Sequence, residues 1–133
     1  MKIVLDTNVL LAAFGTHGLC ESVLELCLER HEVFLSEHIL CELQRNLCTK
    51  FRMATDLAEN VLIFLRESAA VIEPAMMPPS ACRDADDLPV LGTCQAASAD
   101  YLVTGDADLL VLSSYGSTKI LTPREFYEGT RHE

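Results

Sequence analysis

Basic residues are scarce in this chain of 133 residues, which has ten lysines and arginines against twenty aspartates and glutamates. The formal net charge of −10 argues against a large basic surface that grips nucleic acid through its phosphates. It does not exclude nucleic acid as a substrate, because carboxylates that bind a divalent cation are neutralised by it. An acidic chain also suits a basic protein partner.

Long hydrophobic runs and closely paired cysteines are missing as well. The longest uncharged run, Thr7 to Cys20, is too short to span a bilayer, so we expect no membrane segment. Six cysteines without a C-x-x-C spacing, in a chain with no signal peptide, predict reduced thiols and a cytoplasmic location. Zinc binding by cysteines together with His38 is a weaker alternative, because the usual ligand spacings are absent.

Half of the residues are hydrophobic and no low-complexity tract occurs, which predicts one globular domain over residues 1–133. Apolar runs alternate with helical patterns along this domain. The runs predict strands at 3–5, 33–35, 71–72, 101–103 and 120–121. The helical patterns cover 7–14, 19–30, 37–51, 54–68 and 88–99, and a further helix starts near residue 106 or 108.

Two of these predicted strands end in aspartate. Asp6 stops the run Ile3-Val4-Leu5, and Asp106 and Asp108 follow the run 101–103 across a turn that Gly105 permits. In an open parallel sheet, ligands bind outside the carboxyl ends of the strands. Alternatively, Asp6 only caps the helix that follows it, as aspartate commonly does.

An acidic helix start lies between the two strands in the chain. The sequence Arg83-Asp84-Ala85-Asp86-Asp87 precedes an apolar helix, and Pro89 is tolerated only in a first turn. One aspartate here needs no functional explanation, because the helix dipole favours it. Right-handed β-α-β connections would bring all three acidic points to one end of the sheet, where several carboxylates favour Mg²⁺ or Mn²⁺.

The predicted helix 37–51 carries one further candidate acid and the most basic short segment of the chain. Glu42 lies on the flank of its apolar stripe, where a surface position without function is the simpler interpretation. Arg45, Lys50 and Arg52 could contact phosphates, although a solvated helix end is the simpler interpretation for them too.

Together these segments resemble the PIN domain, and most of all the VapC-like ribonuclease toxins of prokaryotic toxin–antitoxin systems. The resemblance extends from residue 1 to about residue 126. It is carried by the helix around Glu42 and by the segments Asp6-Thr7-Asn8-Val9-Leu10-Leu11, Asp84-Ala85-Asp86-Asp87 and Ala99-Asp100-Tyr101-Leu102-Val103-Thr104-Gly105-Asp106-Ala107-Asp108-Leu109-Leu110.

The resemblance implies a three-layer α/β/α fold with a parallel sheet in the order 3-2-1-4-5. It implies an acidic quartet that binds Mg²⁺ or Mn²⁺, in which Asp6, Glu42, Asp87 and Asp106 are catalytic and Asp108 assists as a ligand. The relatives often have polar or charged residues where this chain has Leu88-Pro89, so the choice between Asp86 and Asp87 is open. The supporting polar residues are Thr7, Asn8, Asp84, Asp86 and Thr104, and the expected RNA contacts are Arg45, Lys50, Arg52 and Arg83.

The implied activity is hydrolysis of RNA phosphodiester bonds by a metal-activated water, which leaves 5′-phosphate and 3′-hydroxyl ends. The implied partners are an RNA substrate, a basic antitoxin and a second copy of the chain. Two alternatives remain. One is a non-catalytic PIN-like module that binds a protein or RNA. The other is a receiver-like phosphoacceptor, which would need a lysine near the end of the last strand, whereas Lys119 precedes that strand.

Overall fold

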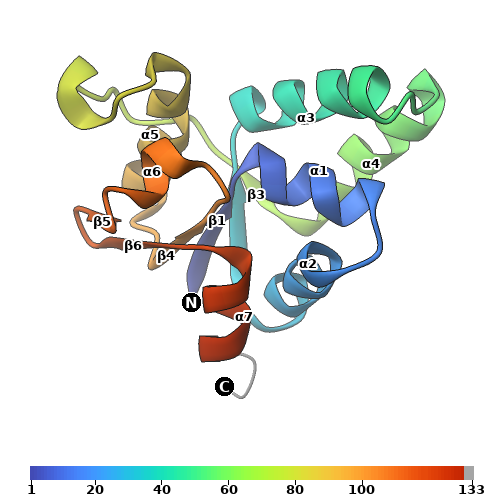
Figure 1. Cartoon of the computed structure of the whole chain (residues 1–133). Helices are drawn as coiled ribbons and strands as arrows, with labels where there is room; N and C mark the ends of the chain where they lie inside the picture. Colours follow the sequence, from blue (N-terminus) through green and yellow to red (C-terminus); the bar gives the residue numbers. More distant parts are fainter. Residues whose placement is uncertain (131–133) are drawn as a thin grey trace.

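A six-stranded sheet forms the centre of the structure, a computed structural model that describes residues 1–130 (Figure 1). The strand order is β3-β2-β1-β4-β6-β5, and every pair is parallel except β5 with β6. The strands are β1 (Lys2–Leu5), β2 (Glu32–Leu35), β3 (Ala70–Val71), β4 (Tyr101–Val103), β5 (Ser114–Tyr115) and β6 (Thr118–Leu121).

Helices cover both faces of this sheet. The helices are α1 (Thr7–Gly15), α2 (Leu19–Arg30), α3 (Glu37–Lys50), α4 (Thr55–Ser68), α5 (Leu88–Ala97), α6 (Ala107–Leu110) and α7 (Pro123–Thr130). Helices α1 to α4 lie on one side and α5 and α6 on the other, so the fold has three layers (Figure 1). Two short 3-10 turns, η1 (Pro79–Ala81) and η2 (Ala85–Asp87), precede α5.

The core explains why these segments fold as they do. Ile3, Val4 and Leu5 of β1 are fully buried, as expected for a strand covered on both faces. Helix α3 buries Leu40, Leu43 and Leu47 at the spacing of one helix face. Full burial of such a side chain stabilises the fold by about 1.5–3 kcal/mol.

The predicted fold class is confirmed. The five parallel strands have the order expected from the family resemblance, and β5 is an additional antiparallel strand that the sequence did not indicate. Strand β3 begins one residue earlier than predicted, and α5 ends at Ala97 because Ser98 adopts a left-handed conformation with φ of 52°. The last three residues of the predicted domain 1–133 lie outside the described residues.

Within residues 1–130, no single helix is long and apolar enough to cross a membrane. By length and composition, only α1 and α2 together pass the same criterion, as a pair bent by 109°.

The topology predicts a ligand-binding site at one end of the sheet. Strand β1 pairs with β2 on one side and with β4 on the other, so the chain first moves outward in one direction and later returns to extend the sheet in the other. In open α/β sheets, ligands bind at this reversal, outside the carboxyl ends of the strands. Asp6 and Thr104 are the residues that directly follow β1 and β4.

Candidate metal centre

Asp6 is held in place by the start of α1. Its backbone is extended (φ −71°, ψ 159°), and its Oδ1 accepts a hydrogen bond of 2.8 Å from the amide of Thr7. The side chain is therefore the N-cap of α1, as the simpler interpretation of the sequence predicted. Its second carboxylate oxygen is directed elsewhere, so capping describes only half of what Asp6 does.

The second oxygen of Asp6 joins the ends of β1 and β4. Asp6 Oδ2 accepts hydrogen bonds from the Thr104 hydroxyl at 2.7 Å and from Asn8 Nδ2 at 3.2 Å. Asn8 Oδ1 in turn accepts from the amide of Gly105 at 2.9 Å, and Thr104 Oγ1 accepts from the amide of Asp106 at 3.0 Å. This network fixes the turn that carries Asp106 beside Asp6.

Burial and hydrogen bonds act in opposite directions on Asp6. Only 5% of the residue is exposed, and this burial raises the pKa of its carboxyl group. The hydrogen bonds from Thr104 and Thr7 lower the pKa, whereas the charges of Asp106 and Glu42 raise it further. A positive charge near Asp6 would therefore stabilise its ionised form.

Asp87 is the most perturbed acid in the described structure. Burial, a hydrogen bond shared with the Asp106 carboxyl group, and repulsion from Asp106, Asp6 and Asp84 together raise the pKa of Asp87 to about 8. Without a cation, the folded protein therefore retains a proton shared by Asp87 and Asp106 near neutral pH. A bound cation would replace that proton.

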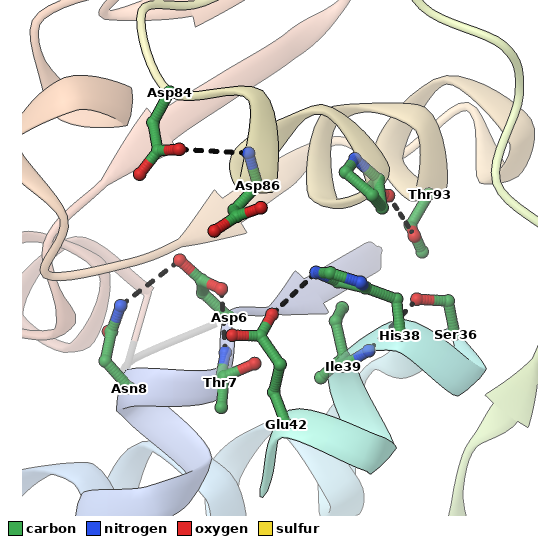
Figure 2. Close-up of polar contacts among 11 residues, drawn as sticks. Asp6, Thr7, Asn8, Ser36, His38, Ile39, Glu42, Asp84, Asp86 and Thr93 are labelled. Carbon is green, nitrogen blue, oxygen red and sulfur yellow. Dashed lines mark hydrogen bonds and ion pairs between the residues drawn. The ribbon is translucent and has the colours of Figure 1, made fainter.

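Glu42 reaches the same region from α3. Figure 2 shows its carboxylate directed toward Asp6, with His38 one turn earlier on the same helix. His38 Nε2 lies 2.6 Å from Glu42 Oε1, and about 30% of each side chain is exposed (31% and 29%). The flank position predicted from helical periodicity is therefore the side that faces the acids.

These acids line one crevice with a volume of about 190 Å³. The structure brings together seven of the residues that the sequence selected, and it adds Leu11 and Asn46, which the sequence analysis did not select. The seven are Asp6, Thr7, Asn8, Glu42, Lys50, Asp87 and Asp106. Asn46 follows Glu42 by four residues on α3, so its position on the same helix face was a usable signal.

The remaining predicted residues do not line the crevice. Thr104 is buried beneath it as part of the hydrogen-bond network. Asp86 is exposed outside the lining, so the geometry places Asp87 and not Asp86 at the centre. Arg45 and Arg52 are exposed outside the lining, and Arg83 is exposed at a neighbouring pocket.

A second grouping of carboxylates overlaps this crevice. Asp84, Asp87 and Asp108 each offer a carboxylate oxygen, and these oxygens lie within 4.8 Å of one another. Asp84 also accepts a hydrogen bond of 3.0 Å from the amide of Asp86, and Asp106 accepts one of 3.1 Å from the amide of Asp108 (Figure 2 shows the first). Asp87 thus belongs to both groups and lies where they meet.

The donor atoms fit a hard divalent cation. All the acids supply oxygen, which Mg²⁺ and Mn²⁺ prefer, and no group of three cysteine or histidine ligands occurs among residues 1–130. Two buried oxygens also lack a hydrogen-bond partner within the described part of the chain, Asp87 Oδ2 and Thr7 Oγ1. Both residues line the crevice, where a cation or its bound water would satisfy them.

The receiver-like alternative requires a lysine beside the acids, and the structure does not place Lys119 there. Lys119 does not precede the strand, as the sequence predicted, but is the second residue of β6. It pairs with Tyr101, the first residue of β4, and therefore lies near the amino end of the parallel strands. The acids lie at the carboxyl end. Lys119 also does not line the crevice.

Comparison with known proteins identifies the family. The family model described as PIN domain matches residues 2–108, which is most of the chain. The chain therefore belongs to the PIN domain family. No protein with a curated description matches it.

A solved structure shows the same fold. It is the crystal structure of VapBC2 from Rickettsia felis, which is bound to a DNA fragment from the VapBC2 promoter. One of its chains matches with a TM-score of 0.64 and 17% sequence identity, over 90% of this chain and 97% of that chain. At this identity the likeness establishes the fold and not the activity.

Proposed function

We propose that this PIN domain is a ribonuclease that depends on Mg²⁺ or Mn²⁺ and hydrolyses phosphodiester bonds of RNA. The observation that carries the proposal is the convergence of Asp6, Asp87 and Asp106 in one crevice, where repulsion and burial raise the pKa of Asp87 to about 8. Strongly perturbed acids in a cleft are typical of functional sites. Membership of the PIN family supports the same chemistry.

Asp6, Asp87 and Asp106 would hold the cation, with Asp108 assisting at the margin. When bound, the cation would supply Lewis-acid activation of a water nucleophile and would neutralise charge on the phosphate. Thr104 and Asn8 orient the Asp6 carboxylate, and Thr7 lines the crevice beside Asp6. Glu42 faces the crevice from α3, in a position to accept a proton from water.

The basic residues would contact the RNA backbone. Lys50 lines the crevice and Arg83 lines the neighbouring pocket together with Asp108, so a strand bound at the acids would contact both. Arg45 and Arg52 are exposed near Lys50 in sequence and would extend this contact. RNA cleavage would take place in the cytoplasm, where reducing conditions would keep the cysteines as free thiols.

We further propose that the chain is the toxin of a toxin–antitoxin pair. The solved structure with the matching fold contains VapBC2, and the crevice suits a basic antitoxin whose arginine or lysine would offset the repulsion among the acids. Such a cation would compete with the metal and inhibit cleavage. A purified complex that cleaves RNA as fast as the free chain would contradict this inhibition.

The test is cleavage of labelled single-stranded RNA in Mg²⁺, Mn²⁺ or a chelator. We expect cleavage by the native chain only with metal, and none detectable for Asp6→Asn. Asp87→Asn should lose nearly as much and Asp108→Asn less. The matched control is Asp56→Asn, which removes the same charge from the exposed first turn of α4 and should cleave normally.

Circular dichroism of each variant separates loss of activity from loss of fold. A folded Asp6→Asn variant that still cleaves would refute the metal-nuclease assignment. A native chain that binds RNA but never cleaves it would favour the non-catalytic module.

A further inference from the structure

A second, larger pocket lies beside the acidic crevice. It has a volume of about 580 Å³ and is formed between the segment around η1 and the segment of α6. Its walls include Ala81, Ala107, Val111 and Leu112, so much of the lining is apolar. We call it the base pocket. Pockets of this size accommodate small organic ligands.

The base pocket also has a polar side. Ser80 and Arg83 line it, and both are exposed. Within residues 1–130, Arg83 forms no ion pair, although Asp84 follows it directly and the chain carries a net charge of −10. Its guanidinium group therefore remains available to a ligand that presents hydrogen-bond acceptors.

Val111 makes the apolar wall accessible. Its exposed fraction is 76%, which is high for a valine that lines a pocket. A flat ligand with apolar faces would cover this side chain and remove it from water. A nucleobase has such faces and an edge of hydrogen-bonding groups, and this combination matches the apolar wall and Arg83.

The base pocket is continuous with the proposed catalytic acids. Asp108 lines the pocket, and its carboxylate lies within 4.8 Å of those of Asp84 and Asp87. Asp87 also lines the acidic crevice. An RNA strand with a phosphate at the acids would therefore have the adjacent nucleotide at the mouth of the base pocket.

We propose that the base pocket binds the nucleobase next to the cleaved phosphate, and that it prefers guanine. The preference follows from Arg83, because a guanidinium group can donate two hydrogen bonds to O6 and N7 of guanine. Adenine, the other purine, presents N7 beside an amino group that donates, so it offers no such pair of acceptors. This inference deepens the proposed ribonuclease function, since it names the part of the substrate that is recognised.

The test uses binding without catalysis. The metal-free chain, with labelled methyl groups, is titrated with guanosine and separately with adenosine, and methyl resonances are followed by NMR. We expect guanosine to shift the resonances of Val111 and Leu112 and to leave Ile63 of α4 unchanged. Uncharged nucleosides avoid repulsion between a phosphate and the metal-free acids.

Three variants identify the groups responsible. Arg83→Gln should weaken guanosine binding about tenfold, to the level of adenosine, because the bidentate contact is lost. Val111→Asp should weaken the binding of both nucleosides about tenfold, because it places a charge against their apolar faces. The matched control is Met76→Asp, which adds the same charge at a residue that is 97% exposed and outside the base pocket.

Several results would overturn the proposal. They are the absence of shifts at Val111 and Leu112, equal affinity for guanosine and adenosine in the native chain, and equal weakening by Met76→Asp and Val111→Asp. A failed cleavage assay would refute the ribonuclease function and leave the nucleoside shifts as evidence for the pocket. Normal cleavage without nucleoside shifts would refute the base pocket alone.

Discussion

Asp87 illustrates how a single residue couples stability to the proposed chemistry. Its pKa is raised to about 8 by burial, by the hydrogen bond shared with Asp106 and by neighbouring charges, whereas the ordinary value is 3.8. Between these pH values the folded chain binds a proton that the unfolded chain has released. Stability of the metal-free protein therefore falls as pH rises through this range.

Replacement of Asp87 by asparagine should remove this pH dependence. We expect Asp87→Asn to melt close to the native chain near pH 4 and increasingly above it as pH approaches 8, in the absence of metal. The measurement is thermal unfolding of both proteins across this range, with Asp56→Asn as the control. Parallel curves for Asp87→Asn and the native chain would contradict the raised pKa.

Sequence patterns located the acids but not their partners. Asp6, Asp87 and Asp106 follow from strand ends and a helix start, because topology brings those points together. The spacing of four residues places His38, Glu42 and Asn46 on one face of α3, whereas the direction of that face depends on how α3 packs against α1, α4 and α5. Helical periodicity gives only the face of a helix, and that face was visible as the spacing of four between these residues.

At the scale of elements, the helix starts differ in how well they are capped. Ser36 accepts a hydrogen bond from the amide of Ile39 and so caps α3, the helix that carries Glu42. Helix α4 begins after Ala54, whose side chain cannot accept one, although its backbone (φ −62°, ψ 145°) has the extended conformation of an N-cap. The stability of α4 is therefore open to improvement.

Ala54→Ser should stabilise the protein by about 0.5–1 kcal/mol, because the serine oxygen would accept a bond from a free amide of the first turn. The measurement is the free energy of unfolding in urea. Ala75→Ser, in the exposed loop after β3, is the control and should leave stability unchanged. An equal effect of both substitutions would show that capping is not the cause.

Strand β5 and helix α7 were missed by the sequence analysis for different reasons. Strand β5 contains only two residues and forms where Gly116, with φ of 57°, turns the chain back to pair Tyr115 with Thr118. Helix α7 packs its Phe126 fully into the core, with the ring 5.8 Å from that of Tyr101. Strand β5 is too short for a local pattern, whereas α7 has a start signal that the sequence analysis did not use. Thr122 and Glu125 exchange hydrogen bonds as a capping box, and Pro123 is the first residue of the helix.

At the scale of the whole molecule, charge and apolar surface are separated. The acids gather at the carboxyl end of the sheet, while α4 exposes Leu57, Ile63 and Phe64, each at least 45% accessible. A second copy of the chain is among the partners that the family resemblance implies. Large exposed apolar side chains on one helix are typical of interaction surfaces.

We expect the chain to form a homodimer through this surface. Light scattering at micromolar concentration should give twice the mass of the chain, and Ile63→Glu should reduce it to that of one chain. Met76→Glu adds the same charge to an exposed apolar residue away from α4 and is the control. A single-chain mass for the native protein at every concentration would refute the expectation.

The two margins of the sheet restrict how copies of the molecule can associate. The outermost strands, β3 and β5, contain two residues each, so neither margin offers a long row of unpaired backbone amides and carbonyls. Such rows are the templates for sheet extension from one molecule to another and for aggregation. Both margins of this sheet therefore disfavour the joining of sheets from two molecules.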